Sequence, residues 1–262
     1  MPYIDYQQLA ALDARIRNEV VVPQVVWQSA GHSHVGRVRQ LNEDAFFNST
    51  DLGLWAVADG MGGHSRGDYA SKVVVESLVH FAVQQSLPET IVHLEARLRE
   101  AHGICRSTFR GERVGSTVAA LLSYSPYVFC VWAGDSRIYR LRENRLKLMT
   151  RDNTVAQEKY ARGELTASQA ATHPTANILT RAVGVHQTLH LDLDFDRVAP
   201  EDRYLICSDG LYNHLSFADI ERYLSGPTAQ ALDTLVDRAL QAGGRDNITA
   251  IITEALPVAV DS

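Results

Sequence analysis

Three apolar runs in this sequence each lead into an aspartate at a predicted turn. The runs are LWAVADG, VFCVWAGDSR and YLICSDG, and they place Asp59, Asp135 and Asp209 at the ends of predicted buried strands. A fourth aspartate, Asp246, precedes the predicted strand NITAIITEA. If this strand runs antiparallel to the others, its beginning lies beside their ends. The four carboxylates would then meet at one edge, where the sheet fixes their backbones.

A cluster of carboxylates at one edge predicts a metal site. Like charges within a few ångströms repel, and such carboxylates take up protons unless cations neutralise them. Oxygen-only ligands select Mg²⁺ or Mn²⁺ over zinc. Two such ions about 3.5–4 Å apart can share one water, lower its pKa and present it for attack on phosphorus. The neighbouring pair Glu43 and Asp44, in RQLNEDAFF, could join the cluster.

Each of these motifs alone is also an ordinary turn sequence, because Asp-Gly and Gly-Asp-Ser are common in turns without any chemistry. Glu43 and Asp44 could lie in a solvated loop, and Arg39 could be a surface charge. The motifs nevertheless occur together, each beside an apolar strand run. This conjunction favours a functional site.

Two amphipathic stretches predict helices that pack on a sheet. Apolar or small residues fall on one helical face at Ala70, Val73, Val74, Ser77, Leu78, Phe81 and Ala82, and then at Ile91, Leu94, Leu98, Ala101 and Ile104. The strand runs that follow, up to about Asn153, are typical of an antiparallel meander with turns at Ser125-Pro126 and Glu143-Asn144.

A polar helical insert from about Asp152 to Arg181 interrupts the strands, and Thr166 with Gln169 matches a capping box within it. Strands and helices then alternate up to NITAIITEA without a βαβ rhythm, which favours an α+β fold of antiparallel sheets flanked by helices. Residues 1–26 carry only a weak helical pattern and are interpreted as an N-terminal appendage.

The net charge of −6 argues against a nucleic-acid or membrane surface, because such partners usually require a basic stripe. No run of apolar residues is long enough to predict a membrane span. Cys105, Cys130 and Cys207 lie far apart without zinc-ligand spacing, which predicts buried thiols in a reducing compartment. We therefore expect a cytoplasmic protein.

The order of the motifs resembles that of the PP2C-like (protein phosphatase 2C-like) metal-dependent serine/threonine protein phosphatases, in particular their bacterial branch. The resemblance runs from about Ser29 to Thr253, over the segments HVGRVRQLNEDAF, WAVADGMGGHSRGDYAS, GSTVAALL, VWAGDSRIYRLREN, LTRAVG, YLICSDGLYNHL and GGRDNITAIIT. It implies a four-layer α-β-β-α sandwich of two antiparallel sheets, with the insert at about 152–181 as a flap. The domain would span 27–256, followed by a tail at 257–262.

The resemblance also implies a role for each site residue in the hydrolysis of phosphoserine and phosphothreonine by water activated on two Mn²⁺ or Mg²⁺ ions. Asp59 looks like the ligand shared by both ions, with the Gly60 carbonyl on one ion and Asp209 and Asp246 on the other. Asp135, with Asp209, matches the ligands of a third ion. Glu43 and Asp44 would hold water molecules of the metal site, and Asn247 would orient Asp246.

Arg39 matches the arginine that holds the substrate phosphate, a task that suits a planar, permanently charged fork. Met61 departs from many eukaryotic members, which have a histidine there as the proposed general acid; the identity of the acid is therefore open, with His64 one candidate. Asn153 and Thr154 are further departures, because relatives usually show Asp-His-Ser at this point.

Within the family, the chain is similar to the phosphatases that accompany type VI secretion clusters and oppose a membrane-bound serine/threonine kinase. The expected partners are phosphorylated proteins, including such a kinase or its target, and the expected state is a monomer. Two other functions stay open: a catalytically dead relative that binds phosphoproteins, and a two-metal nuclease. All ligand positions are occupied by suitable residues, which disfavours the first, and the net charge disfavours the second.

Overall fold

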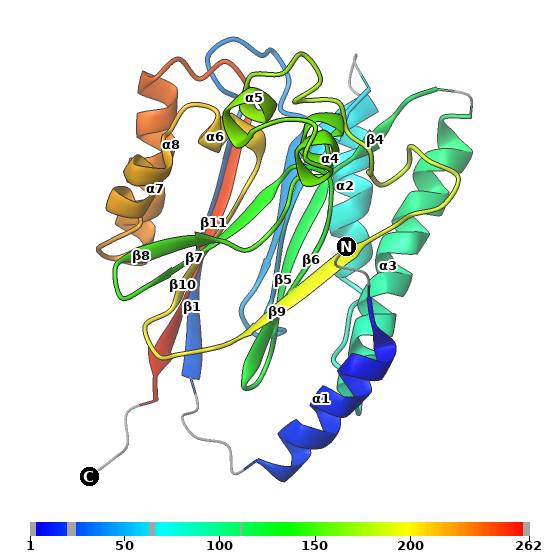
Figure 1. Ribbon diagram of the computed structural model, residues 1–262, viewed down its shortest axis with the longest axis vertical. Helices are drawn as coiled ribbons and strands as arrows, with labels where there is room; N and C mark the ends of the chain where they lie inside the picture. Colours follow the sequence, from blue (N-terminus) through cyan, green and yellow to red (C-terminus); the bar gives the residue numbers. More distant parts are fainter. Residues whose placement is uncertain (1–3, 20–24, 63–65, 111, 259–262) are drawn as a thin grey trace.

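The predicted strand runs build two antiparallel sheets, seen edge-on in Figure 1. The computed structural model describes residues 4–19, 25–62, 66–110 and 112–258. One sheet has the spatial order β1 (Val25–His34), β11 (Ile248–Pro257), β10 (Arg203–Cys207), β7 (Arg137–Arg142) and β8 (Arg145–Leu148). The other has the order β2 (Asp44–Ser49), β3 (Leu54–Met61), β5 (Val118–Tyr124), β6 (Tyr127–Ala133) and β9 (Asp192–Arg197), with β4 (Gly115–Ser116) paired to β3.

Helices cover the outer face of each sheet. Helices α2 (Arg66–Leu78) and α3 (Leu87–Thr108) lie on the sheet that contains β3, and α7 (Phe217–Tyr223) and α8 (Thr228–Gln241) lie on the sheet that contains β11 (Figure 1). The four layers confirm the predicted α-β-β-α sandwich.

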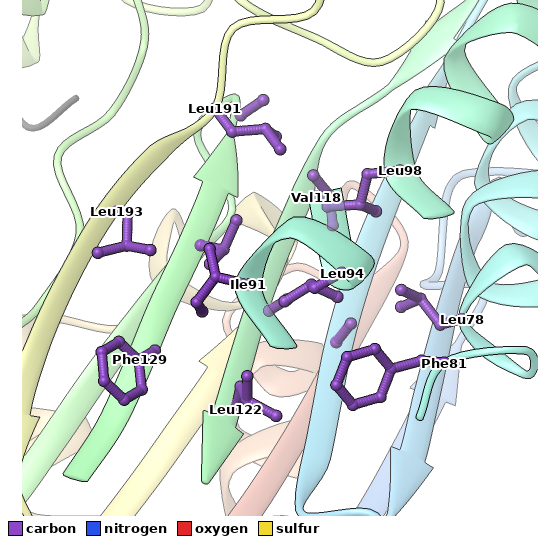
Figure 2. Packing of buried hydrophobic residues seen from close by; sticks show 14 of the residues in the cluster. Leu78, Phe81, Ile91, Leu94, Leu98, Val118, Leu122, Phe129, Leu191 and Leu193 are labelled. Atoms are coloured by element: carbon purple, nitrogen blue, oxygen red, sulfur yellow. The ribbon is translucent and has the colours of Figure 1, made fainter. Parts of the chain in front are cut away.

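Three hydrophobic clusters hold these layers together. The cluster between the sheets includes Trp55 and Trp132 from one sheet and Tyr204 and Ile251 from the other, all fully buried. Each outer cluster joins a sheet to its helices. Figure 2 shows one of them, in which Ile91, Leu94 and Leu98 of α3 lie over Val118, Leu122 and Phe129 of the sheet. Each sheet is therefore packed on both of its faces, which keeps the strand ends in fixed positions.

The predicted buried face of α3 is correct up to Ala101 and wrong at Ile104. Ile104 is 39% exposed, whereas Cys105 is fully buried. A helix has 3.6 residues per turn, so a face followed in steps of three and four must continue from Ala101 to Cys105. The prediction of Ala82 on the α2 face is also wrong, because α2 ends at Leu78 and Ala82 is exposed.

The predicted meander is also wrong in one respect, because its strands divide between the two sheets. β5 pairs with β6 in one sheet, whereas β7 pairs with β8 in the other. The chain crosses between the sheets at Gly134-Asp135-Ser136, where Gly134 has a φ of +118°. This conformation favours glycine and turns the chain sharply, so Asp135 lies on the connection between the sheets.

The insert forms the two short helices α4 (Val155–Ala161) and α5 (Ala167–Ala171), at the same end of the sandwich as α6 (Asp209–Tyr212) in Figure 1. The predicted capping box of Thr166 and Gln169 is present. The two ends of the insert are joined by hydrogen bonds from Val155 N to Ile178 O and from Thr180 N to Asn153 O. We call residues 152–181 the flap.

The N-terminal residues form α1 (Tyr6–Asn18). Asp5 is its N-cap, and the Asp5 side chain accepts hydrogen bonds from the first turn of the helix. Leu9, Leu12 and Ile16 are buried in the cluster of α3 and its sheet. The Asp13 carboxylate accepts a hydrogen bond from the backbone N–H of Leu87 at the start of α3. The division of the chain into 1–26, 27–256 and 257–262 stays a prediction, but α1 is packed on the sandwich.

Because Leu9 is 1% exposed, Leu9→Ala should lower the free energy of unfolding by about 2–5 kcal/mol through lost burial and the cavity left behind. Urea denaturation measures the effect, and Gln8→Ala on the exposed face of α1 is the control. Equal stabilities of the two variants would show that α1 contributes nothing to the packed core.

Candidate metal centre

Two of the predicted residues lie opposite each other on neighbouring strands. Asp44 begins β2, and its Cα partner in the antiparallel register is Asp59 on β3. Asp59 was predicted to end its strand, but β3 continues two residues further, to Met61. The strand pairing therefore fixes the backbones of both aspartates directly.

The other sheet brings Asp209 and Asp246 to the same end. Asp209 is the first residue of α6, directly beyond β10, and Asp246 lies just before β11. β10 and β11 are antiparallel, which confirms the predicted meeting of one strand's end with the other's beginning. Asp135 reaches this end from the connection between the sheets.

Ser208 joins the two halves of the site. Its hydroxyl donates to Asp44 Oδ2 over 2.7 Å, from a position directly beyond β10 to the first residue of β2. Ser208 Oγ also accepts a hydrogen bond from Thr249 N at 3.1 Å. The sequence prediction missed Ser208, although its place in the Ser-Asp-Gly motif was a usable signal.

A second pair of hydroxyls supports Asp59 and the Asp135 turn. Thr117 Oγ1 accepts a hydrogen bond from Asp59 N at 3.0 Å and lies 2.7 Å from Ser136 Oγ. Ser116 Oγ donates to Asp59 O at 3.0 Å. These hydroxyls, from the GSTV and GDS segments, were also missed as supporting residues because their partners are distant in sequence.

Glu43 and Gly60 lie where β3 meets the start of α2. Gly60 N donates to Glu43 O at 3.1 Å, and Gly67 N donates to Glu43 Oε1 at 3.2 Å. A Cβ at Gly60 would lie 2.0 Å from Gly67 O, so only glycine allows the helix to approach the strand this closely. Glu43 thus places its negative charge at the N-terminus of α2, where the helix dipole favours it.

Burial and mutual repulsion weaken the acidity of these carboxyl groups. Burial, followed by the charges of Asp44 and Asp209, holds the pKa of Asp59 well above its usual range. Burial raises the pKa of Asp44 to about 7, against the hydrogen bond from Ser208, and it raises the pKa of Asp135 to about 7 with help from Asp209. The pKa of Asp209 is raised by burial and by Asp246. The site therefore holds its negative charge at a cost that a cation would offset.

The donor set fits a hard cation, since it consists of carboxylate and carbonyl oxygens. Among the described residues, no three acidic, histidine or cysteine side chains already form a closed ligand set for one ion. Mg²⁺ and similar ions keep several waters and need only one or two protein carboxylates. An open arrangement of separate carboxylates suits such ions.

Arg39 lies at the edge of the site, half exposed, with Nη2 2.8 Å from Asp246 Oδ2. This hydrogen bond and the Asp246 charge raise the arginine's pKa further. The Asn247 side chain holds the loop that carries Arg39 on both sides of this residue. It donates to Val35 O and Leu41 O and accepts from Glu43 N. The expectation that Asn247 orients Asp246 is met by its backbone N–H, which donates to Asp246 Oδ1, and not by its side chain.

A cavity of about 380 Å³ lies between the flap and the candidate metal centre. Its lining includes Asp135, Arg137, Asp152, Tyr160, Tyr212 and Asn213. The Arg137 guanidinium makes two hydrogen bonds to Asp152, of 2.9 and 2.7 Å, and stacks 3.7 Å from the Tyr212 ring centroid. Asp152 already neutralises the charge of Arg137, so this arginine is not free to bind a phosphate in the cavity.

Met61 ends β3, and His64 lies outside the described residues. Cys105, Cys130 and Cys207 are free and buried, as predicted. None of the helices in the described part of the chain combines the length and apolar character that crossing a membrane requires.

The protein is thus a sandwich of two antiparallel sheets. A cluster of acidic side chains that would attract cations lies at one end of it, between the strand ends. The model of the family Protein phosphatase 2C matches residues 30–252. The chain belongs to this family.

Several relatives carry this likeness over most of the chain. A solved structure of PppA, a key regulatory component of T6SS in Pseudomonas aeruginosa, is 38% identical, with a TM-score of 0.80 over 88% of this chain and 98% of that one. The serine/threonine phosphatase stp of Listeria monocytogenes is 32% identical over 84% of this chain and 92% of its own length.

The serine/threonine protein phosphatase PstP of Mycobacterium tuberculosis is 32% identical over 88% of this chain. The matched region is about half of the PstP sequence (46%). A solved PstP catalytic domain in complex with two manganese ions is 31% identical, with a TM-score of 0.79 over 89% of this chain and 100% of that one.

Proposed function

We propose that this chain hydrolyses phosphoserine and phosphothreonine in proteins with Mn²⁺ or Mg²⁺ as cofactor. One observation carries the proposal. Four aspartates meet at one end of the Protein phosphatase 2C fold, with Arg39 beside them: Asp59, Asp135, Asp209 and Asp246. The serine/threonine phosphatases among the relatives and the two manganese ions of a PstP structure support the same chemistry.

We assign the ligands as the resemblance suggests. Asp59 would be shared by two ions, with the Gly60 carbonyl on one and Asp209 and Asp246 on the other. Asp135 and Asp209 would hold a third. Glu43 and Asp44 would hold water molecules of the site, and the hydrogen bonds to Gly67 and Ser208 support this by fixing both side chains. Bound there, the ions would lower the pKa of a water, so that it can lose a proton at neutral pH and attack phosphorus.

One assay tests this function against its rivals. Release of phosphate from a phosphothreonine peptide is measured with and without Mn²⁺, beside cleavage of single- and double-stranded DNA. We expect Mn²⁺-dependent release and no cleavage. Peptide binding without turnover would indicate a dead relative that binds phosphoproteins, and DNA cleavage would indicate a nuclease.

Arg39 is the proposed clamp for the substrate phosphate, since its exposed guanidinium lies beside Asp246. Arg39→Ala should lower kcat/KM for a phosphothreonine peptide on the order of a hundredfold, the effect of losing one preorganised charge-assisted donor. Arg37→Ala, a nearby exposed arginine, is the charge-matched control. Calorimetry should show that Mn²⁺ still binds; lost Mn²⁺ binding in Arg39→Ala alone would make the arginine structural.

We further propose that the protein acts as a cytoplasmic monomer that opposes a serine/threonine kinase, with a link to type VI secretion. The similarity to PppA supports the last point. The free, buried cysteines are compatible with a reducing compartment. Sedimentation analysis and phosphoprotein profiling of a deletion strain test these finer points.

A further inference from the structure

His214 lies between the two loops that carry Asp209 and Asp246. Its Nδ1 is 2.8 Å from the carbonyl oxygen of Gly210, the residue directly after Asp209. Its Nε2 accepts a hydrogen bond of 3.1 Å from the backbone N–H of Arg245, the residue directly before Asp246. One imidazole thus bridges the neighbours of two candidate ligands.

The two partners define the tautomer of this ring. A backbone N–H can only donate, so Nε2 must be unprotonated to accept from Arg245. A carbonyl oxygen can only accept, so Nδ1 must carry the proton and donate to Gly210. Both hydrogen bonds therefore form together only with the neutral, Nδ1-protonated ring.

The two loops need such a connection because their carboxylates repel. Among nearby charges, that of Asp246 raises the pKa of Asp209 the most. Gly243 and Gly244 have φ values of +136° and +52°, so the loop before Asp246 relies on glycine conformations rather than on a strand or helix. The loops also touch directly, since a Cβ at Gly210 would lie 1.9 Å from Asn247 O.

We infer that His214 is a positioning residue for the metal centre: it sets the separation of Asp209 and Asp246 by holding both loops through one ring. This inference rests on the proposed function for its metal ligands. Residues that orient metal ligands typically change metal affinity by about 10- to 100-fold when they are replaced. The ring is hydrogen-bonded to the backbone of the residues next to the two aspartates, so its effect should pass through the backbone positions of Asp209 and Asp246.

Three substitutions separate the two hydrogen bonds. His214→Asn places an amide N–H where Nδ1 is and keeps the donation to Gly210, whereas His214→Gln places an amide oxygen near Nε2 and keeps the acceptance from Arg245. His214→Phe keeps the ring and removes both. His80→Phe, at an exposed histidine beyond the end of α2, is the matched control.

The primary measurement is the Mn²⁺ dissociation constant by calorimetry, which does not depend on activity. We expect His214→Phe to raise it about 10- to 100-fold. His214→Asn and His214→Gln should each give a smaller increase, and His80→Phe should give none. Turnover of p-nitrophenyl phosphate by His214→Phe should fall at low Mn²⁺ and recover as the Mn²⁺ concentration rises.

An unchanged Mn²⁺ dissociation constant in His214→Phe overturns the inference. A lower melting temperature of the metal-free variant beside that unchanged constant would show that the ring is purely structural. If wild type binds Mn²⁺ but releases no phosphate from a phosphothreonine peptide, the proposed function fails while this inference stands. A wild-type protein that does not bind Mn²⁺ overturns both.

Discussion

Asp59→Asn should lower turnover of a phosphothreonine peptide at saturating Mn²⁺ by at least about a thousandfold, the upper range for a single preorganised electrostatic contact. Burial acts most strongly on the Asp59 carboxyl group, and the charges of Asp44, Asp209, Asp135 and Asp246 add to its effect. An amide at this position cannot serve as an anionic ligand for two ions.

The fold should survive this substitution, because the asparagine keeps the shape of the side chain and the β3 register with β2. Far-ultraviolet circular dichroism and the melting temperature without metal check this point. Asp51→Asn, at an exposed aspartate in the turn between β2 and β3, is the control. Wild-type turnover by Asp59→Asn would refute the assignment of the shared ligand.

Removal of metal should make the stability of the protein strongly dependent on pH. Asp44 and Asp135 have pKa values raised to about 7 in the fold, mainly by burial. Because the folded state holds these protons more tightly than the unfolded chain does, their contribution to stability is present below about pH 4 and is lost as the pH rises to about 7. The expected loss is on the order of a few kcal/mol.

A comparison with Asp44→Asn/Asp135→Asn isolates this effect from other acid-dependent contacts. In EDTA, urea denaturation should find the double variant more stable than wild type at pH 8, by an amount that shrinks as the pH falls toward 4. Mn²⁺ at pH 8 should restore the wild type, because a ligand that binds only the folded state stabilises it. A stability difference that stays constant from pH 4 to pH 8 would show that these carboxyl groups are not held in an unfavourable charged state.

Much of the site could be predicted from local sequence because strand ends mark it. YLICSDG and GGRDNITAIIT each place an aspartate next to a buried strand, LWAVADG places Asp59 in the last residues of one, and β10 and β11 do bring Asp209 and Asp246 together. The capping box at Thr166 and the three buried cysteines were equally predictable. These features depend on residues within a few positions of each other, where hydrophobic period and capping chemistry decide the outcome.

Local pattern failed where a choice between equally good partners had to be made. β6 and β7 read as one meander, but the strands separate at Gly134, because β7 pairs with β10 and β6 with β9. On α3, the predicted face was extended from Ala101 to Ile104, whereas the period of the helix carries the buried face to Cys105.

The sequence by itself determined which residues could bind a cation, since carboxylate identity and strand-end position are written locally. Only the tertiary structure decided which side chains hold them: Ser208 on Asp44, Thr117 on Asp59, and His214 between the Asp209 and Asp246 loops. The contacts of Ser208 with Asp44, of Thr117 with Asp59 and of His214 with Arg245 join residues that are 164, 58 and 31 positions apart along the chain. No simple periodicity relates such partners, so they become visible only when the strands and loops that carry them are placed in the fold.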